Sequence, residues 1–188
     1  MLKTTYIPTN ILVFHLHIFQ IKLKTKKLTV LIVVLVLVGA TFAVALFQSP
    51  KTGKAAPFKL KNLDGIEVSL EDFRGKVVVL DFMATLCKPC IIQIPHLSKI
   101  HDKYGDKVVI LSISVDPNTD TVERLKLFAS TFNITWTILR DTAKTSYKYD
   151  VTAIPTIFVI DKEGYIKFKH VGVTEESTLS KEIDSLLK

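Results

Sequence analysis

A short apolar strand that runs directly into two closely spaced cysteines restricts the fold of this chain more than any other feature. Residues 76–82 contain the run Val-Val-Val-Leu-Asp-Phe, which is typical of a strand buried on both faces. Cys87 and Cys90 follow, and the apolar residues of 90–104 recur at helical spacing. The pattern predicts a strand–turn–helix unit that carries both cysteines at its turn.

The number and spacing of the cysteines indicate what the pair does. The chain has two cysteines in all, whereas a disulfide scaffold carries more of them, spread along the sequence. Half of a zinc site would need two further Cys or His ligands, and no second Cys-x-x-Cys is present. Two structural core cysteines at this spacing would be a coincidence. We therefore interpret the pair as redox-active, with metal binding as the weaker alternative.

The expected chemistry follows from the position at the start of a helix. A thiol normally titrates near 8.5, and a helix N-terminus with a nearby cation can lower that pKa to roughly 3.5–7.5. We expect Cys87 to be exposed and to attack a substrate disulfide, and Cys90 to point inward and resolve the mixed disulfide. Lys88 adds positive charge, and Pro89 stiffens the first turn without losing a needed N–H. No cofactor beyond the Cys87–Cys90 disulfide is implied.

The remaining elements of residues 57–188 alternate between strands and helices. An Asp-Gly turn separates the short strands predicted at 58–60 and 66–68. Further strands are expected at 108–115, 156–160 and 165–170, and further helices at 121–132 and 179–187. This order predicts an α/β domain in which helices cover a mixed sheet.

The N-terminal part contains an apolar run long enough to cross a membrane. Residues 28–47 carry no charge, and at about 1.5 Å per residue a helix of this length spans the roughly 30 Å hydrocarbon core. The alternative is a cleaved signal peptide, because Ala43-Val44-Ala45 resembles a cleavage site. The run exceeds the usual apolar stretch of about 7–15 residues in such a peptide, so we favour an anchor.

Charge predicts the orientation of this anchor and the class of partner. Residues 1–56 contain seven lysines and no acid, and four of these lysines lie just before the apolar run and two just after it. The positive-inside rule then makes 1–27 a cytoplasmic basic leader, 28–47 the single membrane span, 48–56 a linker and 57–188 an extracytoplasmic domain. In the rest of the chain 18 basic residues balance 18 acids, so we expect no nucleic-acid partner.

The sequence DFMATLCKPC resembles the active-site strand and turn of the thioredoxin superfamily, especially its membrane-anchored TlpA/ResA-like branch. Pro95 stands where thioredoxins kink this helix, and Ile154-Pro155-Thr156 resembles the cis-proline turn that faces the cysteines. Residues 119–132, with the strand after them, resemble the αβ insertion of this branch. The resemblance covers roughly residues 56–188. It implies a thioredoxin-like fold with an N-terminal hairpin, a central insertion and a mixed sheet between helices.

The resemblance also assigns roles to individual residues. Asp81 matches the buried acid that carries protons for the inner cysteine, so it is expected to exchange a proton with Cys90. Burial in an apolar run should raise the pKa of this carboxyl. The alternative is an Asp that is merely hydrogen-bonded at a strand end. Ile154 and Pro155 are expected to offer a short backbone edge to a substrate peptide, beside Lys88 and Pro89.

Several positions depart from the family pattern. Met83 and Leu86 replace tryptophans that are usual there, which keeps an apolar collar but removes a flat stacking surface. Gln93 stands where many ResA-like proteins have a Glu, and Ser112 stands where thioredoxins have a lysine beside the buried acid. His96 and His101 are expected to be exposed helix residues, and Trp136 is expected to serve in packing.

These features together predict a protein-disulfide oxidoreductase in the cell membrane. Its expected partners are disulfide-containing protein substrates, an electron-donor thiol protein and the membrane itself, through residues 28–47. The resemblance favours a reductase, in cytochrome c maturation or disulfide quality control. A Sco-like copper metallochaperone is the alternative, with His170 as the one late histidine, although Sco-like cysteines are separated by three residues. A thiol peroxidase is less favoured, because Ala84 stands where peroxiredoxins have a Thr.

Overall fold

The computed structural model describes residues 53–188. The predicted leader 1–27, membrane span 28–47 and most of the linker lie outside the described residues. Within residues 53–188, no helix combines the length and apolarity needed to cross a membrane. Residues 53–56, predicted as the end of the linker, lie against the domain, where the N–H of Ala55 donates to the carbonyl of Gly164 at 2.9 Å.

The centre of the domain is a five-stranded mixed sheet in the order β5-β4-β3-β6-β7. Strands β3, β4 and β5 run parallel, whereas β6 and β7 are antiparallel to their neighbours. β3 is the middle strand, and all seven of its residues are buried, as expected for an apolar run covered on both faces. The strand bounds are β3 Val77–Met83, β4 Val108–Ser114, β5 Thr137–Arg140, β6 Thr156–Ile160 and β7 Ile166–Val171.

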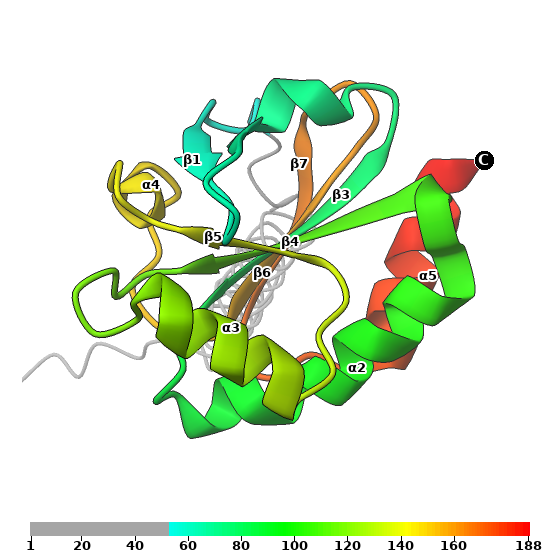
Figure 1. The fold of residues 1–188 in the computed structure, drawn as a ribbon. Coiled ribbons are helices and arrows are strands. Elements are labelled where there is room, and N and C mark those ends of the chain that lie inside the picture. Colours follow the sequence, from blue (N-terminus) through cyan, green and yellow to red (C-terminus); the bar gives the residue numbers. More distant parts are fainter. Residues whose placement is uncertain (1–52) are drawn as a thin grey trace, which may run out of the picture. The chain divides into compact units, whose positions relative to one another are not determined.

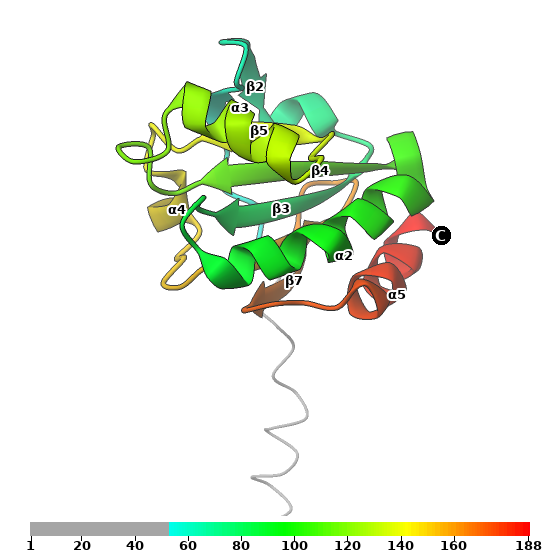
Figure 2. The ribbon, with the colours of Figure 1, turned by 60° about the horizontal axis from the view of Figure 1, so that its bottom comes forward.

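Three helices cover one face of the sheet (Figure 1). They are α2 Lys88–Tyr104, α3 Val122–Thr131 and α5 Glu176–Leu187. The helix α2 runs back along the sheet in the direction opposite to β3 (Figure 2). Val79 and Met83 of β3 pack beneath it, each stabilising the fold by roughly 1.5–3 kcal/mol if fully buried. Asp81 lies between them on the same strand, so strand alternation places its side chain on this face.

The opposite face is covered by short elements (Figure 1). They are the hairpin β1 Lys59–Lys61 and β2 Glu67–Ser69, the 3-10 helix η1 Leu70–Phe73 and the single-turn helix α4 Thr145–Lys148. At the hairpin turn, Asn62 Oδ1 accepts two backbone N–H groups, and Gly65 has a φ of 81°, which glycine adopts readily. The rings of Phe82, Tyr149 and Phe158 pack together beneath this layer.

The structure confirms the predicted α/β domain with a mixed sheet between helices. The long elements agree with the sequence prediction to within about three residues, because periodicity over ten or more residues is a strong signal. Three short elements were not predicted, namely η1, α4 and a second 3-10 helix, η2 Gly105–Lys107. Each has at most four residues, too few to show a period.

Candidate active site

The two cysteines form a disulfide at the point where α2 begins. β3 ends at Met83, a four-residue turn follows, and Cys87 is the N-cap of the helix. Its sulfur accepts the backbone N–H of Cys90 at 3.1 Å, and Pro89 occupies the first turn, where its fixed φ suits a helix. This arrangement points the positive end of the helix dipole at the sulfur of Cys87, and so stabilises its thiolate after reduction.

The two sulfurs differ in their access to solvent. Cys90 is 3% exposed and packs in the core as expected, whereas Cys87, which was expected to be exposed, is half-buried at the surface. The side chains of Lys88 and Pro89 are exposed beside it. An incoming disulfide can therefore reach Cys87, while Cys90 can reach only its neighbour.

A second segment faces the disulfide from the start of β6. The peptide bond between Ile154 and Pro155 is cis, and the carbonyl oxygen of Ile154 lies 3.8 Å from the sulfur of Cys87. Pro155 is buried, and its own carbonyl accepts the N–H of Gly172 at 2.8 Å. The structure thus brings the predicted substrate-facing residues Ile154 and Pro155 next to the cysteines.

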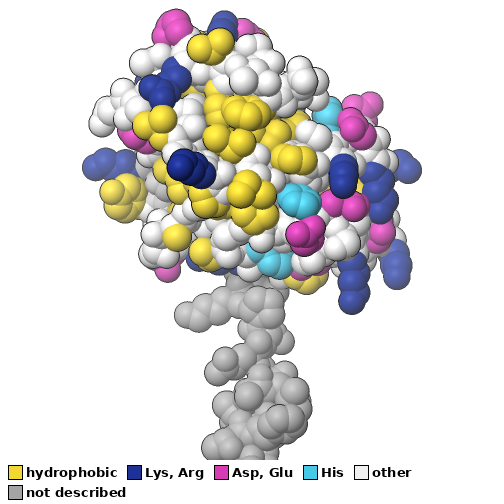
Figure 3. Space-filling model, turned by 90° about the horizontal axis from the view of Figure 1, so that it is seen from below, with side chains coloured by type: hydrophobic (Ala, Val, Ile, Leu, Met, Phe, Trp, Pro, Cys, Tyr) yellow, Lys and Arg dark blue, Asp and Glu magenta, His cyan; other side chains and the backbone are white. Residues whose placement is uncertain are grey.

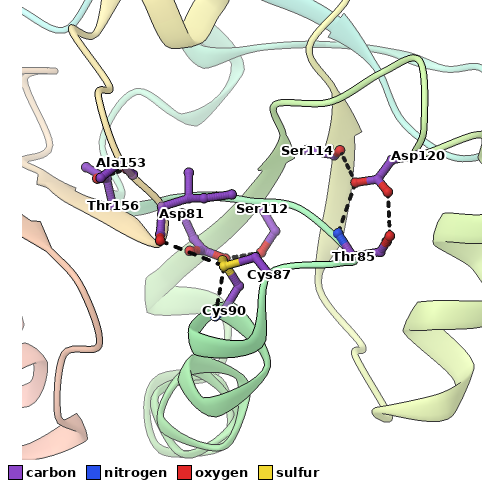
Figure 4. Close-up of a disulfide and its surroundings, with 10 residues drawn as sticks. Asp81, Thr85, Cys87, Cys90, Ser112, Ser114, Asp120, Ala153 and Thr156 are labelled. Carbon is purple, nitrogen blue, oxygen red and sulfur yellow. Dashed lines mark hydrogen bonds between the residues drawn. A yellow bond between two sulfur atoms is a disulfide. The ribbon is translucent and has the colours of Figure 1, made fainter.

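Asp81 is buried on the side of the sheet that α2 covers. Its side chain is 4% exposed, and burial raises the pKa of this carboxyl to about 7, although a hydrogen bond from Ser112 partly opposes the increase. Ser112 lies opposite Asp81 in the β3–β4 register, and its hydroxyl donates to Oδ2 at 2.9 Å (Figure 4). The other oxygen, Oδ1, is buried and has no hydrogen-bond partner among residues 53–188. An acid that titrates near neutral pH can take up and release a proton.

The turn before Cys87 is held by a buried acid that the sequence analysis did not single out. Asp120, in the loop after β4, accepts the N–H of Thr85 at 3.0 Å, the hydroxyl of Thr85, and the hydroxyl of Ser114 at 2.6 Å (Figure 4). Arg124 of α3 donates from Nε to the hydroxyl of Thr85 at 2.8 Å. In the sequence, Asp120 looks like any loop acid, because its partners lie up to 35 residues away.

Some apolar side chains of the elements that carry or flank the disulfide are exposed. Leu86, immediately before Cys87, is 69% exposed, and Ile92 on α2 and Val171 at the end of β7 are exposed as well. Figure 3 shows hydrophobic side chains gathered across one face of the molecule. Contiguous apolar surface of this kind is typical of sites that contact other proteins.

Two histidines predicted to be exposed are half-buried, so that expectation was wrong. His96 Nδ1 accepts the backbone N–H of Glu176 at 3.2 Å, where α5 begins, and lies 3.5 Å from a carboxylate oxygen of Glu175. The ring of His101 packs against Trp136 with 5.9 Å between centroids. The cause in both cases is a neighbouring segment that is distant in sequence.

Gln93 and Trp136 do more than their sequence positions suggested. Gln93 is 1% exposed and forms two hydrogen bonds with the backbone of Thr174, accepting its N–H at 2.6 Å and donating to its carbonyl at 3.0 Å. Trp136 packs in the core as predicted, and its indole N–H also donates to the hydroxyl of Ser112 at 2.9 Å. Ser112 therefore touches both Trp136 and Asp81.

The histidine considered for a metal site is engaged elsewhere. His170 Nε2 lies 3.0 Å from both carboxylate oxygens of Glu182 on α5. Within residues 53–188, no three side chains of the Cys, His, Asp or Glu type gather into a cluster that could hold a metal ion.

Comparisons with known proteins agree with this geometry. Residues 52–169 match the AhpC/TSA family. The chain is 34% identical to the thioredoxin-like protein YneN of Bacillus subtilis, covering 70% of this chain and 78% of the relative. It is 32% identical to the thiol-disulfide oxidoreductase ResA of Geobacillus kaustophilus, over 85% of this chain and 94% of the relative. The fold is similar to the crystal structure of a thiol-disulfide isomerase from Corynebacterium glutamicum, with a TM-score of 0.63, 28% identity and coverage of 71% and 97%.

Proposed function

Because this chain belongs to the AhpC/TSA family and is a thioredoxin-like thiol-disulfide oxidoreductase, we propose that it reduces protein disulfides outside the cytoplasm. Residues 28–47 tether it to the membrane in this proposal, as a single-pass anchor with the lysine-rich leader inside. The observation that carries the proposal is the Cys87–Cys90 disulfide at the start of α2, with one accessible and one buried sulfur.

The reaction begins with Cys87. Its thiolate attacks one sulfur of a substrate disulfide, the substrate S–S bond breaks, and a mixed disulfide forms as the first substrate thiolate leaves. Cys90 then loses its proton and attacks the sulfur of Cys87, which releases the second substrate thiolate. The product is the Cys87–Cys90 disulfide, the state seen in the structure, and two electrons have passed to the substrate.

Asp81 serves as the base of the second step in this proposal. Cys90 packs on the face of β3 from which the Asp81 side chain projects, and no described residue forms a hydrogen bond with Oδ1. With a pKa of about 7, the carboxyl is about half ionised at neutral pH, so it can take the proton of Cys90 and return it in the reverse reaction. A carboxyl with an ordinary pKa would be a much weaker base.

The substrate contacts the protein through backbone and apolar groups. Ile154 and Pro155 present main chain beside the disulfide, and an extended peptide can pair with such an edge. Lys88, Pro89 and the exposed Leu86 complete the rim. A largely apolar rim of this kind suits many unfolded or exposed cysteine-containing segments, including those met in cytochrome c maturation or disulfide quality control.

Each turnover leaves the enzyme oxidised, so a thiol protein that donates electrons must reduce it again. No organic cofactor or metal enters these steps, because the two sulfurs carry both electrons. The direction of net flow depends on the reduction potential of the pair.

That potential is the measurement that tests the direction of the reaction. Full-length protein in detergent micelles is equilibrated in glutathione or dithiothreitol buffers, and free thiols are counted by alkylation. We expect a value near the roughly −270 mV of thioredoxin. A value near the roughly −120 mV of the oxidant DsbA would mean that the protein donates disulfides instead.

The location is tested in intact cells. After mild reduction, a maleimide that cannot cross membranes should label Cys87 without lysis if the domain lies outside the cytoplasm. Labelling that appears only after lysis would place the domain in the cytoplasm and contradict the proposed orientation.

A further inference from the structure

Three buried side chains form a hydrogen-bonded chain that ends at the proposed base. The indole N–H of Trp136 donates to the hydroxyl oxygen of Ser112 at 2.9 Å, and that hydroxyl donates to Asp81 Oδ2 at 2.9 Å. The residues come from the loop before β5, from β4 and from β3, and each is less than a tenth exposed. Sheet order and register bring them together, because Asp81 and Ser112 are direct partners across the β3–β4 pair.

The chemistry of the three groups determines which of them donates and which accepts in each hydrogen bond. An indole nitrogen can only donate, and a carboxylate can only accept. The hydroxyl oxygen of Ser112 is therefore the acceptor for Trp136, and its single proton is directed at Asp81 Oδ2. Without the indole N–H, the hydroxyl could rotate and accept a proton from a neutral Asp81 instead.

The two oxygens of Asp81 consequently differ. Oδ2 accepts the proton of the Ser112 hydroxyl, whereas Oδ1 is buried and has no hydrogen-bond partner in the part of the chain that the structure describes. A proton that Asp81 takes up is then confined to Oδ1.

We propose that Trp136, acting through Ser112, is a positioning residue that keeps Oδ2 of Asp81 occupied and leaves Oδ1 as the oxygen that exchanges a proton with Cys90. The inference rests on the proposed function of Asp81 as the base of the resolving step. It gives Trp136 a role beyond packing, because Trp136 acts on Asp81 through Ser112 in this scheme.

The electrostatic surroundings make this hydrogen-bonded chain the main local influence on Asp81. The neighbouring strands β4 and β6 and the rest of β3 carry no other ionisable side chain, and no charged group contributes to the pKa of Asp81. From α2 the ionisable groups on this side are Cys87, Cys90, His101 and Tyr104, and His101 packs on the ring of Trp136. Burial raises the pKa, and the Ser112 hydroxyl lowers it. If Trp136 no longer orients the Ser112 hydroxyl, the pKa of Asp81 should therefore rise further.

The test follows the resolving step directly. Reduced full-length protein is mixed with the aromatic disulfide DTNB in a stopped-flow instrument. The first released thiolate reports the attack by Cys87. The second reports resolution, in which Cys90 gives its proton to Asp81, attacks the sulfur of Cys87 and expels the remaining aromatic thiolate. The rate of the second phase is recorded against pH.

We expect Trp136→Phe to move the midpoint of the second phase upward by about 0.5–1 pH unit, from the typical free energy of one hydrogen bond. Ser112→Ala should move it at least as far. In the Ser112→Ala background, Trp136→Phe should then cause no further shift, because the two side chains act in series. The first phase should keep its pH profile in every variant.

Two further variants separate this role from packing. Ile138→Val trims a buried side chain in the same core cluster, so it should lower thermal stability without moving the midpoint. Trp136 is the one tryptophan of the chain, so global replacement of tryptophan by benzothienylalanine removes its N–H at nearly constant shape. This replacement should reproduce the shift, and it provides the readout if Trp136→Phe does not fold.

The outcomes are distinguishable from one another. An unmoved midpoint in the benzothienylalanine protein, or equal shifts from Trp136→Phe in both backgrounds, would overturn the positioning role of Trp136. A wild-type protein without a second phase would instead count against the resolving role of Cys90, and so against the proposed function.

Discussion

The carboxylate of Asp120 accepts the backbone N–H of Thr85 at 3.0 Å, across 35 positions of sequence. Thr85 lies two residues before Cys87, and Asp120 is 1% exposed. The loop after β4 thus holds the turn that delivers the attacking cysteine to the start of α2. The segment 119–132, which contains Asp120, is thus physically connected to the active-site turn.

Replacing this acid should loosen the turn. Asp120→Asn keeps the size of the side chain but leaves one acceptor oxygen for the N–H and hydroxyl of Thr85 and the hydroxyl of Ser114. We expect a loss of about 1–3 kcal/mol in the free energy of unfolding, because a buried donor loses its partner. Urea unfolding of the oxidised protein measures this loss.

The same variant should slow the attack of Cys87 on a small disulfide, since the sulfur is less firmly placed at the helix N-terminus. Asp102→Asn, at an exposed position on α2, is the matched control and should change neither quantity. Wild-type stability and rate in Asp120→Asn would mean that this acid does not hold the turn.

Replacing Cys87 and replacing Cys90 should have different effects on disulfide exchange. Cys87→Ser should abolish disulfide exchange, because the accessible sulfur is the nucleophile. In the Cys90→Ser variant, Cys87 should still attack a substrate disulfide. The variant should then accumulate mixed disulfides, since the resolving thiol is missing. Non-reducing gels and mass spectrometry of intact protein detect these adducts. Full exchange activity in the double variant would show that the catalytic assignment is wrong.

The raised pKa of Asp81 predicts how stability depends on pH. The unfolded carboxyl titrates at 3.8 and the folded one at about 7, so between these values the folded protein holds a proton that the unfolded chain has released. Stability from this group is therefore lost as pH rises through that window. The loss between pH 5 and pH 8 is roughly 2–3 kcal/mol as an upper limit.

Asp81→Asn should remove this dependence, because an amide does not titrate. Its free energy of unfolding, relative to that of the wild type, should therefore increase from pH 5 to pH 8, as measured by urea unfolding of the oxidised proteins. A constant difference over this range would show that the carboxyl of Asp81 titrates normally in the folded state.

Gln93 should not tolerate the carboxylate that many ResA-like proteins have at this position. Gln93→Glu removes the donor to the Thr174 carbonyl and buries a charge next to that oxygen. We expect a loss of about 1–3 kcal/mol at pH 7, and a smaller loss near pH 4, where a protonated Glu can donate again. Lys99→Glu, exposed on the same helix, controls for the added negative charge. Equal losses at both pH values would contradict this explanation.

The amino-acid sequence alone was sufficient to predict the local part of the architecture. The run at 76–82, the cysteines that follow it and the helical period of 90–104 predicted a strand–turn–helix unit, and β3, Cys87 and α2 form that unit. The α/β domain with a mixed sheet was confirmed as well. Such features depend on periodicity and on residues adjacent in sequence, so they can be read without knowing which segments meet. The roles of Asp81, Ile154 and Pro155 stay predictions until the variants are measured.

Only the tertiary structure decided which distant side chains surround the site. Trp136 and Ser112 are 24 residues apart, and Thr174 lies 81 residues from Gln93, yet each pair is hydrogen-bonded. Their meeting depends on the order and register of the five strands and on how α5 returns to α2. The sequence shows which hydrogen bonds a side chain can form. Most buried polar groups have a partner, but the packing of the whole sheet determines which residue that partner is.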